Sequence, residues 1–161
     1  MVQLQFLGRT GNAMDDLLND FLAETAEMLA EAGEALVAWE ADPADRERLD
    51  AIFRLVHTIK GSSGFLSLPR VTALSHAVED ALDQVRRGNR IADAALVTAV
   101  LGILDRLAGL CAGLAAGGGG PVGDDSDLIG ALTIAESGAA SQPEVTEIKL
   151  RREEDLGAEL Q

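Results

Sequence analysis

Apolar residues recur at every third or fourth position along four stretches of this 161-residue chain, and short segments containing proline, glycine or aspartate separate the stretches. Such spacing gathers the apolar side chains on one face of an α-helix. Aromatic residues make up only 3% of the chain, whereas alanine and leucine are abundant, and this composition favours helices over strands. We therefore expect an all-α protein in which four amphipathic helices form an antiparallel four-helix bundle.

Residues that favour helix ends mark the boundaries of these four stretches. Asn12 fits an N-terminal cap, and Pro43 and Pro69 suit the first turns of the next two helices. Gly88 is typical of the end of a helix, and Asp93 is typical of the cap before the following one. The expected helices cover residues 13–40, 44–66, 69–87 and 94–114.

The rest of the chain is expected to be appended to this bundle. We expect a flexible N-terminus over residues 1–12, and one domain over residues 13–132 that holds the bundle and a short fifth helix over 124–132. A glycine run followed by proline predicts a linker near residues 116–123. Residues 133–161 show no sustained apolar stripe, so we expect them to form a flexible, disordered tail.

The charge and the cysteine content argue against several classes of function. The formal net charge is -14, and 13 basic residues are scattered among 27 acidic ones, so we expect no nucleic-acid partner. Cys111 is the only cysteine, so it forms neither an internal disulfide nor a cysteine-based metal site, as is usual in a reducing cytosol. We recognise no signal peptide and no run of about 18 apolar residues, and we expect a cytoplasmic protein without a membrane partner.

One histidine lies in the middle of the second expected helix, away from the apolar stripe of that helix. At about 100° per residue, His57 falls roughly 150° from the centre of the stripe, on the same face as Lys60, Gly61 and Gly64. This placement predicts an exposed imidazole. Each glycine costs the helix about 1 kcal/mol relative to alanine, which indicates that Gly61 and Gly64 belong to a surface where a partner protein binds closely.

The sequence around this histidine, FRLVHTIKGSSGF, and a second segment, SHAVEDALDQVRRG, together resemble the histidine phosphotransfer (HPt) domain of CheA-type chemotaxis histidine kinases. The resemblance implies that His57 accepts a phosphoryl group. It also implies that Glu79 orients the His57 ring through Nδ1, which leaves Nε2 free to attack. By the same resemblance, Lys60 stabilises the phosphorylated form and His76 belongs to the same polar network.

The resemblance extends from about residue 14 to residue 114 and on to the fifth helix, and it also implies partners. An ATP-binding kinase domain of the same or a sister CheA would supply the phosphoryl group, and an aspartate of CheY-like or CheB-like response regulators would receive it. The chain shows no glycine-rich phosphate loop, so we do not expect it to phosphorylate itself. We expect no cofactor, and we expect a monomeric fragment of a larger two-component signalling kinase.

Three alternatives remain open from the sequence. One is a stand-alone HPt protein of a multistep phosphorelay, and another is a non-catalytic helical interaction module that docks partners through apolar grooves. The third is a metal site formed by His57, His76 and Glu79. The sequence contains no HExxH motif and no pair of cysteines, so a metal site is not expected.

Overall fold

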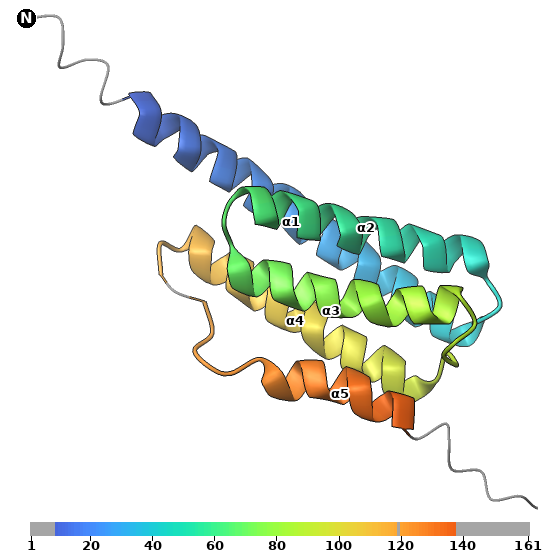
Figure 1. Cartoon of the computed structure of the whole chain (residues 1–161). Coiled ribbons are helices and arrows are strands. Elements are labelled where there is room, and N and C mark those ends of the chain that lie inside the picture. Colours follow the sequence, from blue (N-terminus) through green and yellow to red (C-terminus); the bar gives the residue numbers. More distant parts are fainter. Residues whose placement is uncertain (1–8, 119, 138–161) are drawn as a thin grey trace, which may run out of the picture.

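The computed structural model describes residues 9–118 and 120–137, and the regular structure within this part of the chain is α-helical (Figure 1). The helices are α1 (Arg9–Ala41), α2 (Arg46–Phe65), α3 (Pro69–Arg86), α4 (Ala94–Ala115) and α5 (Ser126–Ser137). The first four helices pack together as a bundle, and α5 packs against α4 and α3. The all-α bundle with a short fifth helix that the apolar spacing predicts is confirmed.

Each of the four bundle helices packs against two neighbours, in the cyclic order α1, α2, α3, α4. α2 packs against α1 and α3, and α4 packs against the same two helices from the other side (Figure 1). Asp50 near the start of α2 meets Arg86 at the end of α3, whereas Ser63 near the end of α2 meets Thr72 near the start of α3. α2 and α3 therefore run antiparallel, and this register determines which of their side chains face each other.

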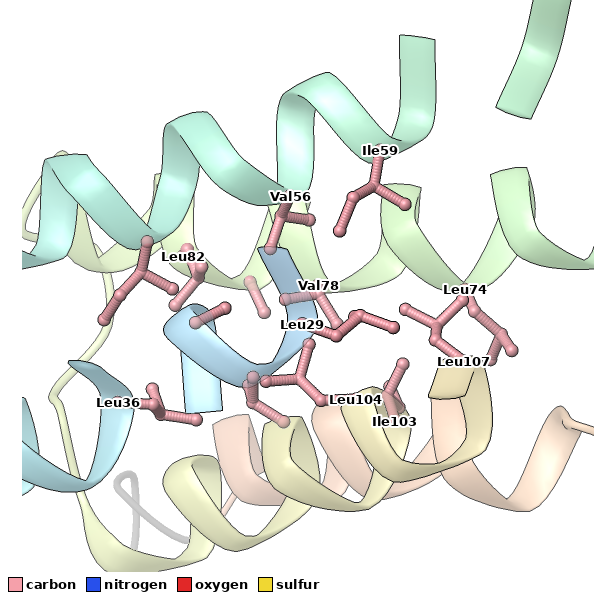
Figure 2. Close-up of a cluster of buried hydrophobic side chains, with 14 of the residues drawn as sticks. Leu29, Leu36, Val56, Ile59, Leu74, Val78, Leu82, Ile103, Leu104 and Leu107 are labelled. Atoms are coloured by element: carbon pink, nitrogen blue, oxygen red, sulfur yellow. The ribbon is translucent and has the colours of Figure 1, made fainter. Parts of the chain in front are cut away.

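Side chains from all four bundle helices fill one hydrophobic core (Figure 2). Leu36 of α1 and Val56 and Ile59 of α2 are completely buried. Burying an apolar side chain of this size contributes roughly 1.5–3 kcal/mol, so the core fixes which face of each helix points inward. The other large side chains that are fully buried are Trp39, Ile52, Leu74, Val78, Leu82, Leu96, Val100, Ile103 and Leu107.

α4 is more apolar than expected from the sequence, in which we recognise no segment that resembles a membrane span. The helix has 22 residues and is long and apolar enough, by length and composition, to cross a membrane. Asp105 and Arg106 interrupt its apolar run, so a search for uninterrupted apolar residues misses it. Eight residues of α4 are buried in the bundle, and the helix packs against α1, α3 and α5. Contact on several sides accounts for its composition, because such a helix is apolar around most of its circumference.

The helix ends confirm some predicted boundaries and correct others. Asp93 caps α4 by accepting a hydrogen bond from a backbone N–H three residues later at 2.8 Å, and Pro69 is the first residue of α3. α2 begins at Arg46 and not at residue 44, because Asp45 caps it in the same way at 2.9 Å. Pro43 lies in the turn before this cap. The start of α2 is therefore set by Asp45, whose side chain accepts a hydrogen bond from a backbone N–H that has no partner within the helix.

α1, in contrast, begins earlier than predicted. The helix begins at Arg9, so Asn12 lies inside it and is not its cap. The helix therefore includes residues 9–12 of the expected N-terminal segment, while residues 1–8 lie outside the described residues. No proline interrupts this part of the chain, and extending an existing helix is far easier than nucleating a new one.

The fifth helix continues beyond its predicted end. α5 runs from Ser126 to Ser137, whereas the sequence predicts an end at Leu132. The first residues of the expected tail are thus helical, because nothing in the sequence breaks the helix at that point. The remainder of that tail, from residue 138 onward, lies outside the described residues.

An arginine of α3 ties the segment before α5 to the bundle. Arg70 Nε and Nη2 donate hydrogen bonds of 2.9 Å to the two carboxylate oxygens of Asp125, and Nη1 donates to the carbonyl oxygen of Pro121 at 2.8 Å. Arg106 of α4 lies 3.3 Å from the same carboxylate. These contacts anchor the end of the linker on the side of the bundle that carries α3 and α4.

Candidate functional site

His57 lies midway along α2, on the face that the core leaves free. Val56 and Ile59, which flank it in the helix, are completely buried. The His57 side chain, in contrast, keeps 60% of its surface exposed. Because successive residues of a helix are rotated by about 100°, the burial of its neighbours turns His57 outward. The imidazole is therefore accessible to another molecule.

Glu79 of α3 contacts His57 of α2 where these two helices pack together. Its Oε1 lies 3.2 Å from His57 Nδ1, and only 13% of the Glu79 side chain is exposed. Lys60, one turn after His57 on α2, places its Nζ 2.9 Å from Oε1 and 2.7 Å from Oε2 of the same carboxylate. The three side chains form one hydrogen-bonded cluster with Glu79 at its centre.

The charge on Glu79 determines where the His57 ring carries its proton. Burial by itself raises the pKa of this carboxyl, but the hydrogen bonds from Lys60 and His57 outweigh burial, so the pKa of Glu79 lies below its ordinary value. An ionised carboxylate only accepts hydrogen bonds, so Nδ1 of His57 donates the proton between them. In the neutral ring, Nε2 then keeps its lone pair, which is directed away from Glu79 and is available for reaction.

His76 has a different partner. Its Nε2 lies 3.4 Å from Oδ2 of Asp80, one turn later on α3, and both side chains are more than half exposed. The hydrogen bonds and ion pairs of the described residues do not connect His76 to His57 or Glu79. The same part of the chain holds no group of three or more His, Cys, Asp or Glu side chains placed to bind a metal ion. The structure therefore does not bring together the three ligands considered for a metal.

Gly61 and Gly64 leave the surface next to His57 open. Both glycines are exposed, and a Cβ atom added to either one would meet no other atom within 4 Å. Packing inside the domain therefore does not require glycine at these positions, although each costs about 1 kcal/mol of helix stability relative to alanine. Beside them, Phe65 is 78% exposed and lines, with Leu17 of α1, a groove of about 360 Å³.

Two further side chains near His57 are absent from the sequence-based predictions. The Phe53 ring, one turn before His57, stacks with the imidazole at a centroid distance of 6.1 Å and an interplanar angle of 14°. Arg86 of α3 places its guanidinium carbon 4.2 Å from the centre of the Phe53 ring. The four-residue spacing of Phe53 and His57 is a signal for their contact. No comparable signal exists for Arg86, because the register of α2 against α3 brings it there.

A family model described as the Hpt domain matches residues 16–112, which is more than half of the chain. The chain belongs to the Hpt domain family. The matched range runs from α1 into α4, so the cluster of His57, Lys60 and Glu79 lies inside it. The resemblance that the two sequence segments indicate is confirmed.

Relatives of this Hpt domain include proteins named chemotaxis protein CheA. The chain is 34% identical over 119 residues to the chemotaxis protein CheA of Treponema pallidum (strain Nichols), and the alignment covers 73% of this chain and 14% of the relative. At 26% identity, the phosphorylated P1 domain of CheA3 in complex with CheY6 from R. sphaeroides matches with a TM-score of 0.68, over 78% of this chain and 99% of that one. The solution structure of the histidine phosphotransfer domain of CheA, also 26% identical, matches with a TM-score of 0.70, over 83% of this chain and 99% of that one.

The fractions of each relative that the alignments cover show how far the similarity extends. The chain spans about a seventh of the length of the Treponema pallidum relative, whereas it covers almost all of the solved Hpt structures. The similarity therefore concerns a small part of that relative.

Proposed function

We propose that this Hpt domain accepts a phosphoryl group on Nε2 of His57 and passes it to an aspartate of a response regulator in a chemotaxis-type signalling system. The observation that carries the proposal is the contact between His57 Nδ1 and the largely buried, ionised carboxylate of Glu79. This contact keeps the proton on Nδ1 and the lone pair on Nε2 of an exposed ring. The similarity to CheA supports chemotaxis as the pathway.

The proposed donor is ATP bound to the kinase domain of the same or a sister CheA-type protein. The lone pair of His57 Nε2 attacks the γ-phosphorus, a nitrogen–phosphorus bond forms, and the bond between phosphorus and the leaving oxygen of ADP breaks. Positive charge develops on the imidazole as the new bond forms. Glu79 accepts the Nδ1 hydrogen bond throughout and stabilises that charge. Because ATP and the kinase domain supply the phosphoryl group, we place the reaction in the cytoplasm.

Lys60 is the cation that we assign to the phosphorylated form. Its Nζ lies one turn from His57, is held by the Glu79 carboxylate, and belongs to a side chain that is 26% exposed. A lysine side chain has enough freedom to turn toward the new phosphoryl oxygens while it stays near Glu79. The resulting ammonium–phosphate contact is charge-assisted and stabilises the product. We assign no phosphoryl contact to His76, which pairs with Asp80.

The proposed acceptor is an aspartate of a CheY-like or CheB-like response regulator that docks on the exposed face of α2. The aspartate carboxylate attacks phosphorus, the nitrogen–phosphorus bond breaks, and Nε2 recovers its lone pair. The open positions Gly61 and Gly64 support close docking there, because no side chain blocks the approach. The structural match to a phosphorylated P1 domain in complex with CheY6 supports a partner of this kind.

The test is phosphate uptake from labelled ATP in the presence of the catalytic domain of a CheA-type kinase. The wild-type chain should gain acid-labile label, and His57→Gln should gain none while it keeps the wild-type melting temperature, because the side chain faces outward. His76→Gln is the matched control and should be labelled normally. A CheY-like regulator added afterwards should take up the label. Labelling of the folded His57→Gln protein contradicts the proposal.

A further inference from the structure

The imidazole of His57 has a second neighbour besides Glu79. The ring of Phe53 lies nearly parallel to it, with an interplanar angle of 14° and ring centroids 6.1 Å apart. This is the offset, parallel arrangement that pairs of aromatic rings favour. Phe53 is only partly exposed and lies one turn before His57 on α2, so its ring forms a flat surface next to the exposed imidazole.

The hydrogen bond to Glu79 does not by itself fix the plane of the His57 ring. The distance from Nδ1 to Oε1 is 3.2 Å, and the same oxygen accepts a shorter bond of 2.9 Å from Lys60. Small coupled changes in the χ1 and χ2 torsions of His57 tilt the ring while Nδ1 stays within hydrogen-bond reach of Oε1, and such a tilt moves Nε2. Phosphoryl transfer requires the attacking lone pair to be aligned with the bond that breaks. A flat group beside the ring restricts this rotation.

Arg86 in turn holds the Phe53 ring. Its guanidinium carbon lies 4.2 Å from the ring centre, which is the distance of a cation–π contact. Nε of Arg86 donates a hydrogen bond of 2.7 Å to Asp50 of α2, and Nη1 lies 3.6 Å from Asp83 of α3. Arg86 is therefore itself oriented by two carboxylates, and it joins the end of α3 to the turn of α2 that precedes His57.

We infer that Phe53, held by Arg86, is a positioning residue that sets the plane of the His57 ring for phosphoryl transfer. The inference rests on the proposed function of His57 as the phosphoacceptor. Glu79 fixes one atom of the ring and Phe53 fixes the plane of the ring, so Nε2 keeps one direction relative to α2. Phe53 and Arg86 act through His57 and touch no phosphoryl group.

Two substitutions at one position separate this role from simple packing. Phe53→Leu keeps an apolar side chain but removes the aromatic face, whereas Phe53→Tyr retains the face. In NMR spectra of the full chain, the carbon-bound ring protons of His57 should lose their ring-current shift in Phe53→Leu and keep it in Phe53→Tyr. The ring protons of His76 serve as the internal control and should not move. Unchanged His57 ring protons in Phe53→Leu overturn the inference.

The rate of phosphorylation by a CheA-type catalytic domain and ATP provides the second readout. We expect the initial rate of Phe53→Leu to fall about 2- to 10-fold, the range that an aromatic pair supplies, and Phe53→Tyr to restore it. Arg86→Gln should lower the rate by a smaller factor. Arg48→Gln is its control, because Arg48 pairs with Asp45 and shares no carboxylate with Arg86, and it should react at the wild-type rate.

The outcomes distinguish this inference from the proposed function. If a folded Phe53→Leu protein reacts at the wild-type rate, the positioning role of Phe53 is overturned. In that case, phosphate uptake by the wild-type chain still upholds the proposed function of His57. A wild-type chain that takes up no phosphate overturns the proposed function and the inference with it, and this case is recognised without any variant.

Discussion

Replacement of Glu79 by alanine tests how much the carboxylate contributes to the reactivity of His57. The change removes the oxygens that lie 3.2 Å from His57 Nδ1 and 2.7 Å from Lys60 Nζ. A hydrogen bond to a charged group contributes about 1.5–3 kcal/mol. The low end applies here, because the His57 side chain is 60% exposed and water replaces part of the lost contact. A loss of about 1.5 kcal/mol in the transition state corresponds to roughly tenfold slower phosphorylation.

The assay is the initial rate of phosphate incorporation with a CheA-type catalytic domain and ATP, measured together with thermal unfolding. Glu79→Ala also leaves Lys60 without its ion pair, so we expect the free energy of unfolding to fall by about 1 kcal/mol while the bundle remains folded. Asp80→Ala is the matched control, because this next residue of α3 is 65% exposed and pairs with His76. A folded Glu79→Ala protein that reacts within twofold of wild type would refute the role of Glu79.

Three further predictions concern the docking surface, α5 and acid pH. Gly64→Leu should keep or raise the melting temperature, since its Cβ meets no atom within 4 Å, but should weaken response-regulator binding several-fold in a titration; unchanged affinity places docking elsewhere. Asp125→Asn should speed amide hydrogen exchange in α5 and not in α2, because Arg70 loses its bidentate partner. Exchange in α5 at the wild-type rate would show that this contact is dispensable. The folded pKa of Glu79 lies below its ordinary value of about 4.3, so its contribution to stability is present above that pH and is lost as the pH falls through the folded pKa. The acid unfolding curve of Glu79→Gln should lack this contribution. Identical acid unfolding curves for the wild type and Glu79→Gln would contradict the prediction.

The helical period predicts the bundle because burial of apolar surface decides the fold. Ile52, Val56 and Ile59 follow that period, and all three are completely buried. Helix ends are harder to predict, since several neighbouring residues compete to form the cap. Asp45 begins α2 although Pro43 also suits a first helical turn, and the choice depends on a single hydrogen bond to the backbone.

The chemical roles within the candidate site come from the resemblance to HPt domains, while the structure adds the distances. A single sequence does not reveal which residues of α2 and α3 face each other, because the register depends on the packing of whole helices. Arg86 beside Phe53 is therefore visible only in the structure. His76 illustrates the reverse situation: it lies in the matching sequence segment, yet its side chain contacts Asp80 and not the His57 cluster.

The central claim is most directly tested by locating the phosphate on the protein. The full chain is incubated with a CheA-type catalytic domain and ATP, and the modified nitrogen is identified by NMR correlation of phosphorus with the ring protons. We predict one acid-labile phosphate, on Nε2 of His57, with the Nδ1 proton still bonded to Glu79. Phosphate on Nδ1 of His57, on His76 or on no histidine would contradict the claim.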